Sequence, residues 1–541
     1  MTRFSAKAKP EATKLRGGYY TPSVIASAIA EWALSVDDRH GQPIRVLEPS
    51  CGDGAIIKEL KGSNLEVVGV ELLESEAIKA RSLGVGSIIN EDFFSWEDRL
   101  DSNVKFDAVI GNPPYIRFGN WDIESRERAL RLMARNGLTP SKLTNAWVPF
   151  VVGAVSRTRP GGRVALVLPA ELLQVGYASQ LREFLTKTCT QISIVSFRTL
   201  VFPDVLQEVV LLLLDVGEGP AQFRTMEIND SEELKHLQFH GKAIRASLDL
   251  NEKWTYYYLD TERIELLRRF VASGAFKKLG DYAKVNVGVV TGRNSFFCMT
   301  KEQADDLDLN RWVIPLVARS AHLRGISFTQ DDLTFNESEG VNTRLLAIPT
   351  NENISNSEAL SDYILEGENA GVHTGYKTRI RKKWWSVPSV AVPDGFMLRQ
   401  ISTLPRIFSN ETRATSTDTV HRVFWIGTTG SVRQLATAAL NTVSCALAEV
   451  YGRSYGGGIL ELEPSECVKL LVPPPELVDE SLMDEVDRLI RCGNIDGARY
   501  LVDQRILVQC LGISSEDVRE FHEILSIMQS RRLNRNRRIN R

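Results

Sequence analysis

The chain has 541 residues and a formal net charge of −3, with 43% hydrophobic and 25% charged residues. This length exceeds what one compact domain usually holds, so we expect several domains. The near-neutral balance excludes a uniformly basic nucleic-acid coat, although basic segments can still be local. The composition is that of an ordinary globular protein with room for a sizeable core.

Seven widely spaced cysteines include no Cys-x-x-Cys pair. Their odd number and spacing predict reduced thiols, with no disulfide framework and no metal site. The N-terminus lacks the apolar core of a secretory signal. The longest apolar run, residues 209–214, is far shorter than the roughly 20 residues that span a bilayer. We therefore expect a cytoplasmic protein that has no membrane partner.

Residues 1–16 are expected to form a flexible, mildly basic arm. From residue 17 onward, short apolar runs alternate with segments of helical period. Strands are predicted at residues 44–48, 66–71, 107–110, 163–168, 192–197 and 208–214, and helices at residues 22–34, 54–61, 74–82, 145–158 and 176–187. This alternation predicts a doubly wound α/β domain with a largely parallel sheet over residues 17–245.

The pattern changes after about residue 245, where turns and aromatic residues no longer follow a clear period. Residues 246–477 are therefore predicted to form a second domain of mixed α/β structure. Helical periodicity returns in the last part of the chain. We expect residues 478–541 to form a helical segment that ends in a basic tail.

A glycine loop follows the strand predicted at residues 44–48, and a helix is predicted after it. Gly52 and Gly54 permit close approach of the backbone to a ligand, at the strand ends where α/β sheets bind cofactors. The dinucleotide fingerprint is absent, and Glu48-Pro49 precedes the loop. A carboxylate at this position suits a cationic ligand better than a pyrophosphate. S-adenosylmethionine (AdoMet), which carries an ammonium and a sulfonium, fits this requirement.

Further polar residues follow the next strands in order. Glu71 ends the second strand about 20 residues after the loop, where a carboxylate accepts ribose hydroxyls. Asp92 can accept from an adenine amine, and the ring of Phe93 can lie against the base. Upstream, Thr21 is predicted as a helix N-cap with Pro22 in the first turn, so that the helix N-terminus favours the methionine carboxylate.

The tetrapeptide at residues 112–115 is Asn-Pro-Pro-Tyr and directly follows a predicted strand. Its prolines remove two backbone donors, so the loop presents two acceptors, the Asn112 carboxamide and the Pro113 carbonyl. An exocyclic aryl amine is a poor nucleophile because its lone pair is delocalised into the ring. Two acceptors favour a localised lone pair, while Tyr115 stacks on the base. The tetrapeptide therefore predicts in-line methyl transfer to a nucleobase amine through positioning and electrostatic preorganisation.

The sequence resembles the gamma class of DNA adenine-N6 methyltransferases from restriction–modification systems. The resemblance rests on YYTP, LEPSCGDG, GVE, NEDFF, GNPPY and GGRVALVLP, in the family's order, from residue 17 to about 215. It implies a Rossmann-like AdoMet-dependent domain followed by a target-recognition domain. The AdoMet contacts implied are Tyr20, Thr21, Glu48, Pro49, Ser50, Gly52, Glu71, Asp92, Phe93 and Asn112.

The resemblance also implies how the target base is held. Catalysis falls to Asn112, Pro113 and Tyr115, and a second aromatic residue sandwiches the flipped adenine. Phe202 matches that second position best, with Phe197 left open as the alternative. Flipping costs a few kcal/mol, and stacking of about 1–3 kcal/mol per base offsets part of that cost.

Sequence selection requires a second surface that reads DNA. Residues 284–299 and 311–324 resemble the opening of the family's target-recognition domain, and residues 376–388 interleave basic and aromatic side chains. Basic groups contact phosphates and base edges, and aromatic groups wedge or support the strand. A solvated basic strand is the alternative. The residues expected to contact double-stranded DNA are Arg117, Lys377, Arg379, Arg381, Lys382, Lys383 and Trp384.

The predicted function is therefore site-specific methylation of adenine N6 in duplex DNA. It protects host DNA from a cognate restriction endonuclease that is functionally paired with this protein and not bound to it. An RNA or protein-glutamine amine methyltransferase is one alternative, and a non-catalytic AdoMet-fold DNA-binding protein is another. A bifunctional restriction–methylation enzyme is less expected, because only about 16 residues precede the first motif.

Overall fold

The computed structural model describes residues 21–36, 41–62, 64–141, 143–202, 208–237, 239, 242–243, 249, 252–455 and 457–534. These residues divide into two compact units, which meet in the sequence between Glu265 and Leu266. Residues 455, 457–458 and 531–534 also belong to the first unit. The domain limits 17–245, 246–477 and 478–541 stay predictions. Of the described helices, none has the length and apolarity needed to cross a membrane.

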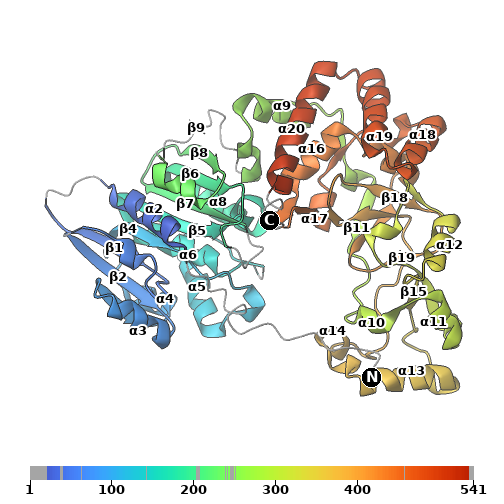
Figure 1. Cartoon of the computed structure of the whole chain (residues 1–541), viewed down its shortest axis with the longest axis horizontal. Helices are drawn as coiled ribbons and strands as arrows, with labels where there is room; N and C mark the ends of the chain where they lie inside the picture. The colour runs from blue at the N-terminus through green and yellow to red at the C-terminus, as the bar shows by residue number, and fades with distance from the viewer. Residues whose placement is uncertain are drawn as a thin grey trace. The chain divides into compact units, whose positions relative to one another are not determined.

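The first unit contains a large sheet with strand order β3-β2-β1-β4-β5-β7-β6-β8-β9 (Figure 1). The strands are β1 Ile44–Glu48, β2 Leu65–Glu71, β3 Ser87–Asn90, β4 Phe106–Gly111, β5 Thr158–Pro169, β6 Cys189–Phe197, β7 Val209–Val216, β8 Gln222–Ile228 and β9 Lys242–Ala243. Strands β3 to β5 are parallel, and β7 inserts antiparallel between β5 and β6. This is the Rossmann-like methyltransferase architecture that the sequence predicts.

Helices cover both faces of this sheet. They are α2 Ser23–Leu34, α3 Glu74–Ser82, α4 Phe93–Arg99, α5 Ile123–Arg135, α6 Trp147–Arg157, α7 Glu171–Gln174 and α8 Ser179–Thr188. Ile25 and Ile29 of α2 share a buried cluster with Ala108 and Ile110 of β4. Side chains alternate along a strand, so the buried Val109 points to the opposite face, where α6 packs on β4 and β5. The central strands are apolar throughout because both faces are covered.

The helix predicted at residues 54–61 is wrong. The structure has a single 3₁₀ turn there, Ile57–Glu59, after a close-packed loop. Gly54 has a φ of +86°, and a Cβ at this position would lie 2.5 Å from the Leu83 side chain. The loop therefore packs directly against α3, and this close approach replaces regular helix.

The second unit combines several small sheets with helices and lacks the strand–helix alternation of the first. Its largest sheet has the order β11-β20-β16-β18-β14. The strands are β10 Lys277–Lys278, β11 Ala283–Asn286, β12 Cys298–Met299, β13 Val313–Val317, β14 Ser327–Phe328, β15 Arg344–Leu346, β16 Gly395–Leu398, β17 Gln400–Ile401, β18 Ile407–Asn410, β19 Thr415–Ser416, β20 Val420–Trp425, β21 Arg453–Tyr455, β22 Ile459–Glu461 and β23 Leu471–Val472. This agrees with the mixed fold that the sequence predicts.

The remaining helices are α9 Thr261–Ala272, α10 Asn294–Phe297, α11 Lys301–Asp306, α12 Gln330–Ser338, α13 Glu358–Asn369, α14 Tyr376–Arg379, α15 Val432–Ala438, α16 Thr442–Tyr451, α17 Pro464–Cys467, α18 Glu480–Arg491, α19 Ile495–Val502 and α20 Ser515–Asn534. One core cluster of the second unit lies between residues 289 and 390 and is built around Phe296 and Phe297. Helix α14 lies in this part of the unit, next to α13 (Figure 1). The helices from α18 onward form the helical segment predicted near the end of the chain.

Candidate active site

Three segments far apart in the sequence meet where the chain order of the sheet reverses. β1 lies between β2 and β4 in the sheet. The chain leaves the ends of β1 and β4 at the same edge of the sheet but toward opposite faces, and α/β sheets bind ligands in the crevice that this creates. Asn112, just after β4, donates from Nδ2 to Thr21 Oγ1 at 3.2 Å. Ser50, after β1, donates from Oγ to the Asn112 carbonyl at 3.5 Å. The sheet thus brings together Thr21, Ser50 and Asn112, as the motifs require.

The expected cap of α2 is corrected by one residue. Pro22 is the N-cap, with φ −55° and ψ 140°, and Ile25 and Ala26 donate to its carbonyl. Thr21 makes no cap hydrogen bond, because its hydroxyl accepts from Asn112 instead. The threonine therefore ties the segment before α2 to the Asn-Pro-Pro-Tyr tetrapeptide. Tyr20, expected beside it, lies outside the described residues.

Glu48 ends β1 with a buried carboxylate that is only 2% exposed. Its Oε2 has no hydrogen-bond partner among the described residues. Burial raises the pKa of this carboxyl well above its usual range, and the nearby Glu71 and Asp53 raise it further. An amide of Ile57 lowers the pKa in part. A buried carboxylate with an unused oxygen is the chemistry that a cationic ligand would satisfy.

Glu71 fixes the glycine loop. Its Oε2 accepts from the Gly52 amide at 2.9 Å, and its Oε1 accepts from the Leu73 amide at 2.8 Å. Burial raises the pKa of Glu71, and these two hydrogen bonds oppose the rise. Leu72, which the sequence argument missed, follows with 64% of its surface exposed. An exposed leucine beside a strand-end carboxylate offers an apolar surface to a nucleoside ring, and the Leu-Leu pair after Glu71 is the sequence signal for it.

Asp92 and Phe93 both have partners within the protein. Asp92 caps α4 by accepting from the Ser95 amide at 2.9 Å, and its second oxygen accepts from Ser125 Oγ at 2.7 Å. Phe93 is buried, and its ring stacks on Phe150 at a centroid distance of 5.2 Å and an interplanar angle of 18°. The Phe93 ring therefore belongs to an aromatic core, and Asp92 links α4 to α5.

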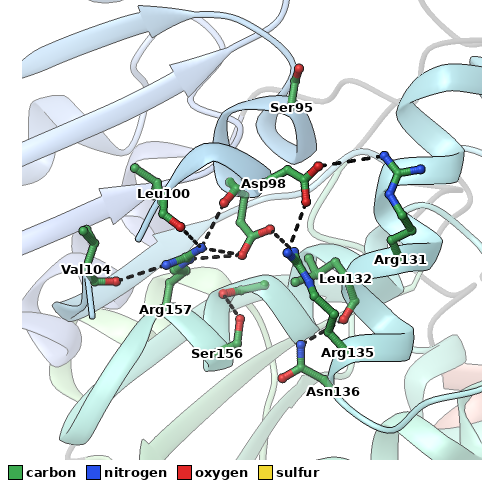
Figure 2. Close-up of polar contacts among 12 residues, drawn as sticks. Ser95, Asp98, Leu100, Val104, Arg131, Leu132, Arg135, Asn136, Ser156 and Arg157 are labelled. Atoms are coloured by element: carbon green, nitrogen blue, oxygen red, sulfur yellow. Dashed lines mark hydrogen bonds and ion pairs between the residues drawn. The ribbon is translucent and has the colours of Figure 1, made fainter. Parts of the chain in front are cut away.

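A cluster of charged side chains from α5 and α6 contacts helix α4. Arg157 donates to both Glu97 Oε1 and the Glu97 carbonyl, at 2.8 and 2.9 Å, and to the Asp101 carbonyl at 2.7 Å. The Glu97 and Arg157 side chains are only 4% and 7% exposed. Figure 2 shows Arg157 and Arg135 converging on α4, where Arg135 pairs with Glu97 at 2.8 Å and with Asp98 at 3.1 Å. This cluster fixes the helix whose first residues are the Asp92-Phe93 motif.

The Asn-Pro-Pro-Tyr tetrapeptide follows β4, and its tyrosine hydroxyl lies close to the carboxamide oxygen of its asparagine. Tyr115 Oη lies 3.1 Å from Asn112 Oδ1 and 3.1 Å from the Val167 carbonyl. A phenol has one hydrogen to donate, so these two oxygens are alternative acceptors. Tyr115 can therefore leave Asn112 Oδ1 and still keep a hydrogen bond to Val167.

The two phenylalanines considered for the second face of the base are both buried. Phe197 and Phe202 belong to one apolar cluster, against which Tyr115 also packs. Their burial does not choose between them, and the assignment of Phe202 stays a prediction. Arg117, just beyond the tetrapeptide, is exposed. Among the described residues, no group of three His, Cys, Asp or Glu side chains has the arrangement of a metal site.

The basic segment of the second unit, residues 376–388, has some side chains that point into the protein and others that point to the solvent. Arg381 donates to the Val290 carbonyl at 2.9 Å and to the Thr291 carbonyl at 2.7 Å. Lys383 donates to the Glu352 carbonyl at 3.1 Å, and Trp384 packs on the buried Phe296 ring. The outward side chains, all exposed, are Lys377, Arg379 and Lys382. The sequence alone does not separate these two sets.

Two segments of the chain match known protein families. Residues 73–202 match the Eco57I restriction-modification methylase, and residues 251–507 match the C-terminal domain of the Type II methyltransferase M.Eco57I. The Type II methyltransferase M.AccI of Acinetobacter calcoaceticus is 24% identical over 502 residues, which cover 87% of this chain and 88% of M.AccI. M.XamI of Xanthomonas campestris pv. amaranthicola is 24% identical over 485 residues, which cover 85% of each chain.

A solved structure supports the fold. The Type IIL restriction-modification enzyme MmeI, determined in complex with DNA, aligns with a TM-score of 0.56 at 12% identity. The alignment covers 90% of this chain and 73% of MmeI. The two family matches fall in separate parts of the chain, in the order of a catalytic segment followed by its C-terminal domain. The chain is therefore similar, over most of its length, to DNA methyltransferases of Type II restriction-modification systems.

Proposed function

We propose that this site-specific DNA methyltransferase transfers the methyl group of AdoMet to N6 of an adenine flipped out of duplex DNA. One observation carries the proposal: Asn112 lies at the sheet's switch point with Thr21 and Ser50, just after β4, and the neighbouring strand β1 ends in the buried carboxylate of Glu48. An acceptor for a base amine and a site for a cationic donor are thereby brought to one strand edge. The Asn-Pro-Pro-Tyr resemblance supports adenine as the base.

The residues that would hold AdoMet fit its chemistry. The free Oε2 of Glu48 suits a positive charge, and Glu71 retains lone pairs for ribose hydroxyls beyond its two amide partners. Leu72 offers an apolar surface to the adenine ring of the cofactor. When bound, AdoMet supplies an electrophilic methyl group.

The chain's own part in the reaction is to orient the amine. Asn112 Oδ1 accepts one N–H of the base amine, and the Pro113 carbonyl accepts the other. The Tyr115 hydroxyl shifts its hydrogen bond from Asn112 to the Val167 carbonyl, and the Tyr115 ring stacks on the base. The amine lone pair is then localised toward the methyl group. The methylated amine is acidic and loses its proton without a strong base.

Analysis of the methylated nucleoside tests the proposal. Purified protein is incubated with genomic DNA and AdoMet labelled in its methyl group, and the DNA is then digested to nucleosides. We expect the label in N6-methyladenine at one short sequence, located by sequencing of modified bases. Label in 4-methylcytosine would overturn the choice of base. Label in RNA or in a protein glutamine, with none in DNA, would overturn the choice of substrate.

The pH dependence of AdoMet binding tests the role of Glu48. A cationic ligand binds the ionised carboxylate, so binding releases a proton wherever the pH lies below the raised pKa. Affinity is therefore expected to rise with pH up to that pKa and then to level. Glu48→Gln should lower affinity about 10- to 100-fold, the loss of one charged hydrogen bond, and should flatten this dependence. Calorimetric titration over a pH series measures both.

The stability of the ligand-free protein separates this role from a structural one. The folded pKa of Glu48 lies above the ordinary carboxyl value. Its contribution to stability is therefore present below the unfolded pKa and is lost as the pH rises through the folded pKa. At a pH above the folded pKa, the melting temperature of Glu48→Gln should be no lower than that of the wild type. Glu66→Gln, at an exposed site on β2, is the matched control and should leave AdoMet binding unchanged. A lowered melting temperature for Glu48→Gln would contradict the assignment.

The matches to restriction-modification methylase models disfavour the two alternative functions. An RNA or protein-glutamine methyltransferase does not account for the match of residues 251–507 to a Type II methyltransferase domain. A non-catalytic protein does not account for an intact acceptor loop next to a cation site. The proposal includes protection of host DNA against a cognate restriction endonuclease that cleaves the same sequence.

A further inference from the structure

We propose that an exposed wedge on and just after α14 inserts into duplex DNA and unstacks a base step, while the cations beside it hold the flanking phosphates. The wedge consists of Tyr376 and Ile380, and its cations are Lys377, Arg379 and Lys382. The proposal rests on the proposed function, because it takes duplex DNA as the substrate. It deepens that function by naming the side chains that deform the duplex.

The two apolar side chains of the wedge are exposed to an unusual degree. Tyr376 is 67% exposed and Ile380 is 62% exposed. They lie four residues apart around one helical turn, and residues with this spacing lie on the same side of a helix. Large apolar side chains that share an exposed face and are rimmed by polar groups mark an interaction site.

The charge around the wedge identifies its partner as an anion. Lys377, Arg379 and Lys382 are all exposed and bring three positive charges to the outer side of the segment. The Lys377 ammonium lies 5.7 Å from the centre of the Tyr376 ring, so charge and ring are presented together. Cations that flank an apolar wedge are the combination by which architectural proteins enter and kink a DNA duplex.

The wedge is held rigidly from the inside, so it is ready before DNA arrives. Thr378 is 1% exposed, and its hydroxyl donates to the Val372 carbonyl at 2.7 Å. Arg381 is fixed by the carbonyls of Val290 and Thr291. Alternate residues of one short segment therefore point inward to anchor it and outward to the solvent. Such preorganisation lowers the entropic cost of binding.

Unstacking is what the proposed reaction requires of some part of the protein. A target adenine leaves the duplex only when its stacking is broken, which costs free energy. A wedge that opens a base step offsets this cost by occupying the space of the lost stack. The wedge thus joins sequence-independent phosphate binding to a deformation that favours base extrusion.

The test uses full-length protein and a synthetic duplex that carries the mapped methylation sequence, with 2-aminopurine next to the target adenine. Fluorescence anisotropy gives affinity over a salt series, and 2-aminopurine emission reports unstacking. We expect Arg379→Ala and Lys382→Ala each to weaken binding to all duplexes and to reduce the salt slope by about one. We expect the double variant with Tyr376→Ala and Ile380→Ala to show no increase in 2-aminopurine emission and to bind DNA about tenfold more weakly.

Matched controls lie in the same unit. Leu365, 55% exposed on α13, is the control for the apolar pair, and Arg488, 64% exposed on α18, is the control for the cations. Leu365→Ala and Arg488→Ala should leave affinity, salt slope and emission unchanged. All these variants should keep the wild-type melting temperature, because the substituted side chains are exposed.

Two outcomes would overturn the wedge. If the wedge and cation variants kept the wild-type 2-aminopurine emission and the wild-type salt slope, the wedge would have no role in DNA binding. Retained DNA binding with a specific loss of binding to phosphatidylserine vesicles would reassign the face to a membrane. Failure of the proposed function is distinguishable, because the wild type would then transfer no methyl group to any duplex. If the wild type methylates DNA and the variants match it, the wedge alone is wrong.

Discussion

Asn112→Ala is expected to lower kcat for methyl transfer by at least about 10²–10³-fold, the cost of removing one preorganised polar group aimed at the reacting atom. In the proposed mechanism the carboxamide oxygen is the side-chain acceptor for the base amine, and alanine cannot replace it. AdoMet affinity should change little, because Glu48 and Glu71 remain in place. Single-turnover transfer of labelled methyl, together with calorimetric titration of AdoMet, measures the two effects separately.

Tyr115 provides the matched comparison in the same tetrapeptide. Tyr115→Phe keeps the ring and loses only the hydroxyl that lies between Asn112 Oδ1 and the Val167 carbonyl, so turnover should stay within a few-fold of the wild type. Tyr115→Ala removes the ring, and kcat/KM should fall by about 5- to 150-fold, as expected for one lost base stack. Near wild-type transfer by Asn112→Ala would contradict the amine-orientation mechanism.

Arg157→Ala is expected to destabilise the first unit by about 3 kcal/mol, the lower end of the range for removal of one partner from a buried ion pair. The substitution leaves the Glu97 carboxylate buried and deprives carbonyls at the end of α4 of their donor. Arg135 still pairs with Glu97 at 2.8 Å, which keeps the loss at the lower end. Urea denaturation followed by far-UV circular dichroism measures the change.

An exposed pair on the neighbouring helix gives the control. Arg128 and Glu124 form an i,i+4 ion pair on α5 whose glutamate is 74% exposed. Arg128→Ala should cost no more than about 0.5 kcal/mol. If Arg157→Ala and Arg128→Ala had equal effects, the buried cluster would not be what fixes α4. The double variant with Glu97→Gln and Arg157→Met should be more stable than Arg157→Ala, because the buried Glu97 carboxylate is then no longer charged.

The sheet of the first unit was predictable because its strands are short apolar runs with a clear period. The strand predicted at residues 44–48 and the helix predicted at residues 74–82 coincide with β1 and α3. The helix predicted at residues 54–61 fails because its apolar residues pack around a loop that depends on Gly54 and on its contact with α3. Such a contact comes from a neighbouring element and leaves no local pattern.

Residue positions were predictable where they depend on a strand end, and contacts were not predictable where they depend on distant partners. Glu48, Glu71 and Asn112 lie at the carboxyl ends of strands, as their positions in the sequence indicate. Thr21 was predicted as a helix cap, yet its partner is 91 residues away. Trp384 and Arg381 were predicted to face DNA with their neighbours, yet they contact Phe296 and the carbonyls of Val290 and Thr291. Composition alone cannot separate such residues from exposed ones.

The way Arg381 is anchored has a consequence for how this segment can vary. Its partners are main-chain oxygens, whose positions depend little on which side chains their residues carry. Replacing an outward residue such as Arg379 therefore disturbs no anchoring contact. Natural variation, or a designed library, can remodel the outer side of this segment at little risk to folding, which makes it a practical place to vary the strength of the proposed phosphate contacts.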